Sequence, residues 1–290
     1  MEIFIAKSSG FCFGVKRAIN MADSCARETA GEIYTLGPII HNPQVVKMLE
    51  ESSGVHAKES LDEVASGTVI IRSHGVRLDE MQKAREKGLN VIDATCPFVK
   101  KAQELVSRLS AEGYTVVVAG EKDHPEVKGL VSYGSSDIRV ADSHEALMDM
   151  PRTKKIGIIA QTTLPIEKLE DVVSACLLKA TELKVFNTIC NATSIRQKES
   201  AELARRVDVM VVVGGRNSAN TRRLAEICRS IREKTYHIEV AGEIDPAWFE
   251  GAASVGVTSG ASTPDWVIDN AVVRIREISQ GKGADRPVNA

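Results

Sequence analysis

The sequence has few aromatic residues, no surplus of basic charge and no apolar run long enough to cross a membrane. Aromatic residues make up 4% of the 290 residues, and the formal net charge is −2. Proteins that bind nucleic acid or anionic lipid usually show a clear basic surplus, so we expect no nucleic-acid partner and no membrane partner. The first residues also lack a basic region followed by a long apolar one. We therefore expect a cytoplasmic protein.

Several short motifs are missing as well. The chain has no Walker loop, no G-x-G-x-x-G loop and no C-x2-C pair of the kind common in zinc sites. Its six cysteines are not expected to form disulfides in a reducing compartment, which leaves buried thiols, metal ligands or catalytic groups. Cys25, Cys176 and Cys228 fall inside apolar helical patterns. We predict that these three are small core residues.

The other three cysteines share one setting. Cys12, Cys96 and Cys190 each follow an apolar strand pattern and precede a helical one, and they are 84 and 94 residues apart. This near-equal spacing predicts an α/β protein of three similar small domains with mainly parallel sheets. The predicted boundaries are 12–95, 96–189 and 190–278, with the N-terminal strand in 1–11 completing the third domain and a mobile tail at 279–290.

Polar loops recur at matched distances after these cysteines. A first loop carries His41, His124 or Ser218, each 28 or 29 residues after its cysteine, and a second carries His74, Thr162 or Ser262. Parallel sheets gather ligands outside the carboxyl ends of their strands, and both the cysteines and the loops follow strand ends. We therefore expect these side chains to converge on one centre.

Three thiols at helix N-termini suggest a metal centre. The positive end of a helix favours a thiolate, and three thiolates facing one cavity would repel each other without a cation between them. Zinc and an iron–sulfur cluster both accept thiolates, but a cluster better suits ligands from three separate domains. Three cysteines leave one iron of a 4Fe-4S cluster without a protein ligand, which favours catalysis over simple electron transfer.

The loops around this centre are rich in hydrogen-bond donors. Such a set suits an anion such as phosphate, and it includes Asn220 beside Ser218. Glu126 lies in the loop that carries His124, where burial would raise the pKa of its carboxyl toward a value useful in proton delivery.

The motifs resemble those of the 4-hydroxy-3-methylbut-2-enyl diphosphate reductase family, the last enzymes of the non-mevalonate isoprenoid pathway. The resemblance covers nearly the whole chain. It rests on G-F-C-F-G-V around Cys12, G-P-I-I-H-N-P around His41, R-S-H-G around His74, D-A-T-C-P around Cys96, H-P-E at 124–126, Q-T-T at 161–163, the Cys190 segment with Thr193 and Arg196-Gln197, N-S-A-N at 217–220, and G-A-S at 260–262.

This resemblance implies a pseudo-threefold trefoil of the three domains around a central cavity with an oxygen-sensitive 4Fe-4S cluster. It implies reductive removal of the substrate hydroxyl to give isopentenyl and dimethylallyl diphosphate, with the substrate oxygen on the open iron. The electron donor is expected to be ferredoxin or flavodoxin. The implied roles are cluster ligation by Cys12, Cys96 and Cys190, proton supply by Glu126, ordering of the hydroxyl end by Thr162 and His124, and diphosphate binding by His41, His74, Ser218, Asn220 and Ser262. Ala219 departs from the serine expected at its place, which removes one possible diphosphate contact.

Two other functions use the same residues. A zinc-dependent hydrolase of a phosphorylated metabolite would need the same thiols and histidines, but it would be colourless, whereas an iron–sulfur protein is brown. A cluster-bearing redox sensor would act through a partner. It would not need the phosphate-compatible loops.

Overall fold

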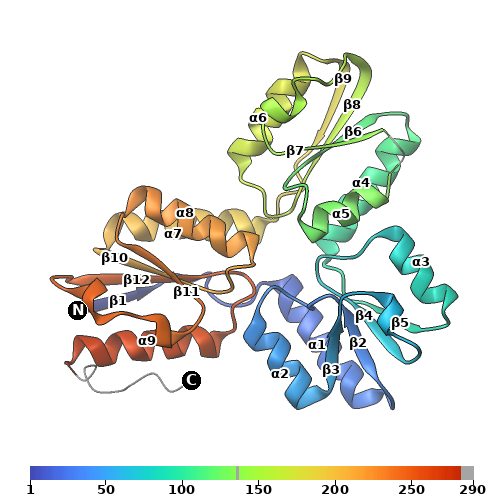
Figure 1. Ribbon diagram of the computed structural model, residues 1–290. Helices are drawn as coiled ribbons and strands as arrows, with labels where there is room; N and C mark the ends of the chain where they lie inside the picture. The colour runs from blue at the N-terminus through green and yellow to red at the C-terminus, as the bar shows by residue number, and fades with distance from the viewer. Residues whose placement is uncertain (135–136, 282–290) are drawn as a thin grey trace. The chain divides into compact units, whose positions relative to one another are not determined.

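The computed structural model describes residues 1–134 and 137–281, and within them the strands form three four-stranded sheets (Figure 1). Every pair of neighbouring strands is parallel. The chain divides into two compact units, which we describe separately. The first unit comprises residues 1–15, 41–45 and the chain from Asn191 onward, and the second comprises 16–40 and 46–190.

The first unit contains one sheet, in the order β1-β12-β10-β11. Its strands are β1 (Glu2–Ile5), β10 (Val209–Val213), β11 (Thr235–Ile238) and β12 (Ser254–Ser259). Helices α7 (Asn191–Arg206) and α8 (Ala219–Ile231) cover one face, and α9 (Asp265–Ser279) covers the other (Figure 1). The short 3-10 helices η3 (Ala241–Glu243) and η4 (Pro246–Phe249) follow β11. The N-terminal strand thus fills the place that the third repeat leaves open.

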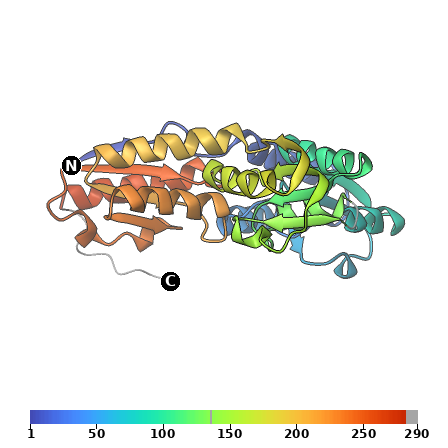
Figure 2. The ribbon, with the colours of Figure 1, turned by 90° about the horizontal axis from the view of Figure 1, so that it is seen from above.

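Burial on both faces explains the sequence of the central strand β10. Val209, Val211 and Val213 pack into the core on the α9 side, whereas Met210 and Val212 pack against α7 and α8, which lie side by side over the sheet (Figure 2). Side chains of a strand alternate between faces, so a strand with helices on both sides is apolar throughout. Each fully buried side chain of this size contributes roughly 1.5–3 kcal/mol.

The second unit contains the other two sheets. The first has the order β3-β2-β4-β5, with β2 (Ile33–Leu36), β3 (Val55–Lys58), β4 (Thr68–Ile71) and β5 (Asn90–Asp93). Its helices are α1 (Phe13–Glu28) and α2 (Pro43–Ser53), whose greater parts belong to this unit, with the 3-10 helix η1 (Leu61–Glu63) and α3 (Leu78–Glu86).

The second sheet of this unit has the order β7-β6-β8-β9. Its strands are β6 (Thr115–Ala119), β7 (Ile138–Ala141), β8 (Thr153–Ala160) and β9 (Ala180–Phe186). Helices α4 (Pro97–Ala111) and α5 (Pro125–Ser132) cover one face and α6 (Ile166–Leu177) the other, and the 3-10 helix η2 (Glu145–Leu147) precedes β8 (Figure 1).

The predicted α/β class with parallel sheets is confirmed, whereas two local predictions are wrong. The sequence predicts a helix over 166–180, but α6 ends at Leu177 and β9 begins at Ala180, because this segment pairs with β8 from Thr153 onward. The sequence also predicts Asp142 as the cap of a helix over 145–148, where the structure has η2. The Asp142 carboxylate instead lies 3.1 Å from the ammonium of Lys168, and Asp171 accepts the His144 N–H at 2.7 Å.

Other sequence predictions concern features that the structure does not test. The three domain boundaries and the trefoil around a cavity stay predictions. The predicted mobile tail falls largely on residues 282–290, outside the described residues. Among the residues that are described, no helix combines the length and apolar character that crossing a bilayer requires.

Candidate active site and metal ligands

The three predicted ligand cysteines each stand directly before a helix. Cys12 precedes α1, Cys190 precedes α7, and Cys96 is the N-cap residue of α4, which begins with Pro97. All three are partly exposed. Backbone N–H groups without an intrahelical partner and the helix dipole both favour a negative charge at this position. These thiols are therefore suited to bind a metal as thiolates.

The remaining cysteines have the opposite environment. Cys25, Cys176 and Cys228 are buried inside helices, as the sequence predicts for core residues. Burial raises the pKa of Cys176 to about 11 and that of Cys228 to about 12. Such thiols stay protonated at neutral pH, so Cys176 and Cys228 are poor metal ligands. The donor set thus separates into three suitable thiols and three core residues.

Each ligand cysteine is tied through its backbone to one of the predicted polar loops. The Cys96 N–H donates to the Ser73 carbonyl at 2.9 Å, beside His74. The Cys190 N–H donates to the Thr162 carbonyl at 2.9 Å. In the first unit the Cys12 N–H donates to the carbonyl of Ala261 at 3.1 Å, next to Ser262. The same connection therefore occurs three times between a cysteine and the second loop of a repeat.

Glu126 has the most unusual environment among the predicted site residues. It lies in the first turn of α5, and only 1% of its surface is exposed. Its Oε1 accepts the Thr162 N–H at 2.6 Å, and its Oε2 accepts the Thr162 hydroxyl at 2.7 Å. Burial raises the pKa of Glu126 to about 7, although both hydrogen bonds from Thr162 act to lower it. The sequence left open whether Glu126 is buried; in the structure it is, and the carboxyl can both hold and release a proton near neutral pH.

Two histidines of the second unit adjoin Glu126 in turn: His124 accepts its N–H, and His74 contacts His124. His124 is the N-cap of α5, and its Nδ1 accepts the Glu126 N–H at 3.2 Å. In a neutral ring the proton of His124 is then on Nε2. The rings of His74 and His124 meet edge to face with centroids 5.7 Å apart. The structure therefore brings together His74, His124, Glu126 and Thr162, with Cys96 and Cys190 on the adjoining backbone.

The first unit contains a second polar group around the start of α8. Ser218 is the N-cap of α8, and its hydroxyl accepts the Thr221 N–H at 3.3 Å. The Ser262 hydroxyl donates to the His41 carbonyl at 3.3 Å. A Cβ on Gly215 would come within 2.8 Å of this carbonyl, so only glycine permits the close approach of the two loops. His41, Ser218 and Ser262 are thus held on connected loops.

Asn220 is the strongest sign of an anion site in this unit. It is 5% exposed, and both its Nδ2 and its Oδ1 are buried without a hydrogen-bond partner among the described residues. A buried amide without partners costs stability, and a bound anion or an ordered water would supply the missing hydrogen bonds. Its place in the first turn of α8 adds unpaired backbone N–H groups and the helix dipole, which favour an anion.

Sequence reasoning gave no role to Asn42 and Thr221, which are buried in the same unit. The Asn42 Oδ1 accepts the Val45 N–H at 3.0 Å, but its Nδ2 and the Thr221 hydroxyl have no hydrogen-bond partner in the described part of the chain. Asn42 follows His41 within the G-P-I-I-H-N-P motif, which was the available signal. Thr221 had no such signal, because its burial depends on the packing of α8 against distant glycines.

The structure leaves the predicted meeting of the three thiols untested. Cys12 belongs to the first unit, and Cys96 and Cys190 belong to the second. Within residues 1–134 and 137–281, no group of three or more His, Cys, Asp or Glu side chains is arranged to hold a metal ion. The joint ligation of one cluster by the three cysteines stays a prediction.

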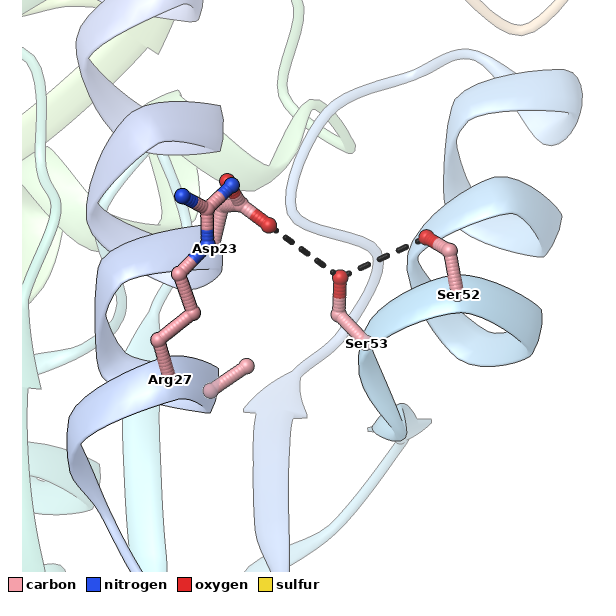
Figure 3. Close-up of a pocket in the computed structure, with 5 residues that line it drawn as sticks. Asp23, Arg27, Ser52 and Ser53 are labelled. Carbon is pink, nitrogen blue, oxygen red and sulfur yellow. Dashed lines mark hydrogen bonds and ion pairs between the residues drawn. The ribbon is translucent and has the colours of Figure 1, made fainter.

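A pocket of about 470 Å³ lies elsewhere in the second unit, between α1 and α2 (Figure 3). It is lined by Asp23, Ala26, Arg27, Ser52 and Ser53. The Ser53 hydroxyl donates to Asp23 at 3.3 Å, and Arg27 pairs with the same aspartate. None of the predicted site residues lines this pocket, and its polar groups satisfy one another.

Comparison with known proteins decides the family. The family model described as LytB protein matches residues 3–276. The chain belongs to the LytB family. The 4-hydroxy-3-methylbut-2-enyl diphosphate reductase of Pelobacter propionicus is 59% identical over 280 residues, which cover 97% of this chain and 99% of that protein. The enzyme of the same name from Geobacter metallireducens is 57% identical over 282 residues, with the same coverage.

Solved structures agree with this assignment to the LytB family. A structure of (E)-4-hydroxy-3-methyl-but-2-enyl diphosphate reductase, described as the terminal enzyme of the non-mevalonate pathway, has 47% identity and a TM-score of 0.72 and covers 96% of this chain and 100% of its own. The corresponding reductase of Plasmodium falciparum has 27% identity and a TM-score of 0.88, with coverage of 94% and 87%. The resemblance found in the motifs is confirmed, and membership of the LytB family implies an iron–sulfur cluster.

Proposed function

We propose that this chain reduces 4-hydroxy-3-methylbut-2-enyl diphosphate, removing the hydroxyl to give isopentenyl and dimethylallyl diphosphate. Near-complete coverage of reductases at up to 59% identity supports the activity. The observation in the structure that carries the proposal is the buried Glu126 carboxyl, which has a pKa of about 7 and two hydrogen bonds from Thr162. Removal of a hydroxyl needs a proton at the leaving oxygen, and this group is suited to deliver it.

Cys12, Cys96 and Cys190 would hold a 4Fe-4S cluster in this proposal. Their placement before helices fits thiolate ligation, whereas burial and a raised pKa make Cys176 and Cys228 unsuitable. With three protein ligands, the bound cluster would supply electrons and a Lewis-acid iron. The backbone bonds of the cysteines to the loops of Ser73, Thr162 and Ala261 would fix the thiols relative to the substrate-binding side chains.

Glu126 would act as the proton donor to the departing hydroxyl. Because burial raises the pKa of Glu126 to about 7, both the acid and its conjugate base are accessible near neutral pH. Thr162 fixes both oxygens of the carboxyl, and its hydroxyl would order the hydroxyl end of the substrate. His124, with its proton on Nε2, would donate a second hydrogen bond there.

The diphosphate would be held by His41, Ser218, Asn220 and Ser262 of the first unit, with His74 of the second unit as a further ligand. The buried, unpaired amide of Asn220 and the first turn of α8 support an anion at this place. Ala219 is the first residue of α8 and offers no hydroxyl. The flanking Ser218 and Asn220 therefore carry more of the binding.

The test is an anaerobic assay of the reconstituted protein with 4-hydroxy-3-methylbut-2-enyl diphosphate and chemically reduced methyl viologen. We expect oxidation of the reduced dye and formation of isopentenyl and dimethylallyl diphosphate. Reduced ferredoxin and flavodoxin should replace the dye, because we propose a protein of this type as the electron donor. Absence of product from fully loaded protein would refute the proposed function.

A further inference from the structure

The loop that leads from β1 to Cys12 is fastened to the end of β12 within the first unit. The Gly10 N–H donates to the Ser259 hydroxyl at 2.8 Å, and the Cys12 N–H donates to the Ala261 carbonyl at 3.1 Å. Ala261 adjoins Ser262, which we place at the diphosphate. The position of the Cys12 backbone is therefore coupled to the position of a substrate-binding turn.

A carboxylate from α7 holds the middle of this loop. Oε1 of Glu199 accepts the Lys7 N–H at 2.6 Å, and Oε2 accepts the Ser8 N–H at 2.8 Å. Burial alone would raise the pKa of Glu199, but hydrogen bonds from Ser8 and Lys7 outweigh it and bring the pKa below its ordinary value. The carboxylate is thus ionised at neutral pH. Hydrogen bonds of this charge-assisted type are stronger than neutral ones.

A buried arginine on the same helix holds the other side of the same peptide. Arg196 is 3% exposed, and its Nη1 donates to the Ser8 carbonyl and, at 3.3 Å, to the Ser259 carbonyl. Arg196 and Glu199 are three residues apart, which places them on one face of α7. Together they bind the N–H and the carbonyl of Ser8 and join the Cys12 loop to the end of β12.

We propose that Arg196 and Glu199 are positioning residues that fix Cys12 for ligation of the metal cluster and, through Ala261, set the turn that carries Ser262. This inference rests on the proposed role of Cys12 as a cluster ligand. Neither side chain touches the substrate in this account. The two residues act by holding the loop, four to five residues before the ligand, in a single conformation.

The first experiment measures the reactivity of Cys12 in metal-free protein. The rate of alkylation by iodoacetamide is followed by peptide mass spectrometry for Cys12 and, as an internal reference, for Cys96. In Glu199→Gln, either the Lys7 or the Ser8 N–H faces an amide nitrogen, which cannot accept a hydrogen bond. The loop before Cys12 should therefore open more often. We expect the ratio of the Cys12 rate to the Cys96 rate to rise about tenfold, which is ~1.4 kcal/mol in the opening equilibrium.

Glu202→Gln is the matched control, because Glu202 is an exposed carboxylate on the same helix. It should leave the rate ratio unchanged. Arg196→Lys keeps the charge but loses the contact of one group with both the Ser8 and the Ser259 carbonyl, so it should also raise the ratio. It replaces Glu199→Gln in the test if that variant fails to fold. An unchanged ratio in the folded variants, or equal acceleration at Cys12 and Cys96, would overturn the proposal.

The second experiment examines the reconstituted protein. In Glu199→Gln we expect faster loss of iron to a chelator and a shifted electron paramagnetic resonance signal of the reduced cluster, compared with wild type and Glu202→Gln. An identical signal and an identical rate of iron loss would contradict the proposal. If the wild type takes up no cluster, the proposed function fails, whereas the alkylation ratio still decides whether the two residues position Cys12.

Discussion

Replacement of Glu126 by glutamine tests the proton donor with little change in shape. The glutamine oxygen can accept the Thr162 N–H, and its amide nitrogen can donate to the Thr162 hydroxyl, which is able to rotate. The variant should therefore fold and load its cluster like the wild type. Loss of a general acid typically costs a factor of about 10² to 10⁴ in rate. We expect a fall of this size in kcat, measured anaerobically with reduced methyl viologen.

The same change should alter the dependence of the reaction on pH. Wild-type kcat should fall as the pH rises through about 7, because the Glu126 carboxyl loses its proton there. The residual activity of Glu126→Gln should lack this fall. Glu167→Gln, an exposed carboxylate on α6, is the control and should keep both the rate and the pH profile. If Glu126→Gln stays within threefold of wild type in kcat, Glu126 is not the proton donor.

Stability provides an independent check of the Glu126 environment. A carboxyl whose pKa rises from 4.5 to about 7 on folding binds its proton more tightly in the folded state than in the unfolded state. The free energy of unfolding therefore falls as the pH rises from about 4.5 to 7, by an amount on the order of 3 kcal/mol. Glu126→Gln should lack this contribution, so its stability relative to wild type should increase over that interval. A constant difference between pH 4.5 and 8 would refute the raised pKa.

Variants at three positions test the residues around the substrate. Thr162→Val removes the hydroxyl that lowers the Glu126 pKa, so the fall in kcat should move to higher pH. Thr162→Ser keeps a hydroxyl and should restore the wild-type pH profile. Equal pH profiles in the valine variant and the wild type would contradict this. Asn220→Ala should raise KM for the diphosphate about tenfold with a smaller change in kcat, since it removes one hydrogen bond to a charged group; an unchanged KM would exclude Asn220 from binding. Ala219→Ser adds a hydroxyl in the first turn of α8 and should lower KM, whereas a higher KM would count against a diphosphate at this turn.

The repeated pattern made the main parts of the site predictable. A cysteine at a strand-to-helix turn and polar loops at matched offsets follow from local sequence, because the carboxyl ends of parallel strands lie at one edge of a sheet. The structure adds that each cysteine N–H donates to a carbonyl in a second polar loop, as Cys190 does to Thr162 of the preceding repeat. The sequence singled out Glu126 by its place beside His124, whereas its burial became evident only from the structure.

Features that depend on distant contacts were not predictable. The bonds of Glu199 to Lys7 and Ser8 join residues more than 190 positions apart, and no local pattern indicates them. The same holds for the unpaired amide of Asn220, since its burial results from tertiary packing. The boundary between α6 and β9 was missed because pairing with β8 determined where the strand begins.

The proposed ligation of one iron–sulfur cluster by Cys12, Cys96 and Cys190 underlies the proposed function. The most direct test of this ligation is anaerobic analysis of iron and acid-labile sulfide in the reconstituted wild type, in each single cysteine-to-serine variant of these three, and in Cys25→Ser as the control. We predict about four irons and four sulfides per chain in the wild type and the control, and marked depletion in each of the three variants. Full iron and sulfide content in any of those three would contradict the proposed ligation.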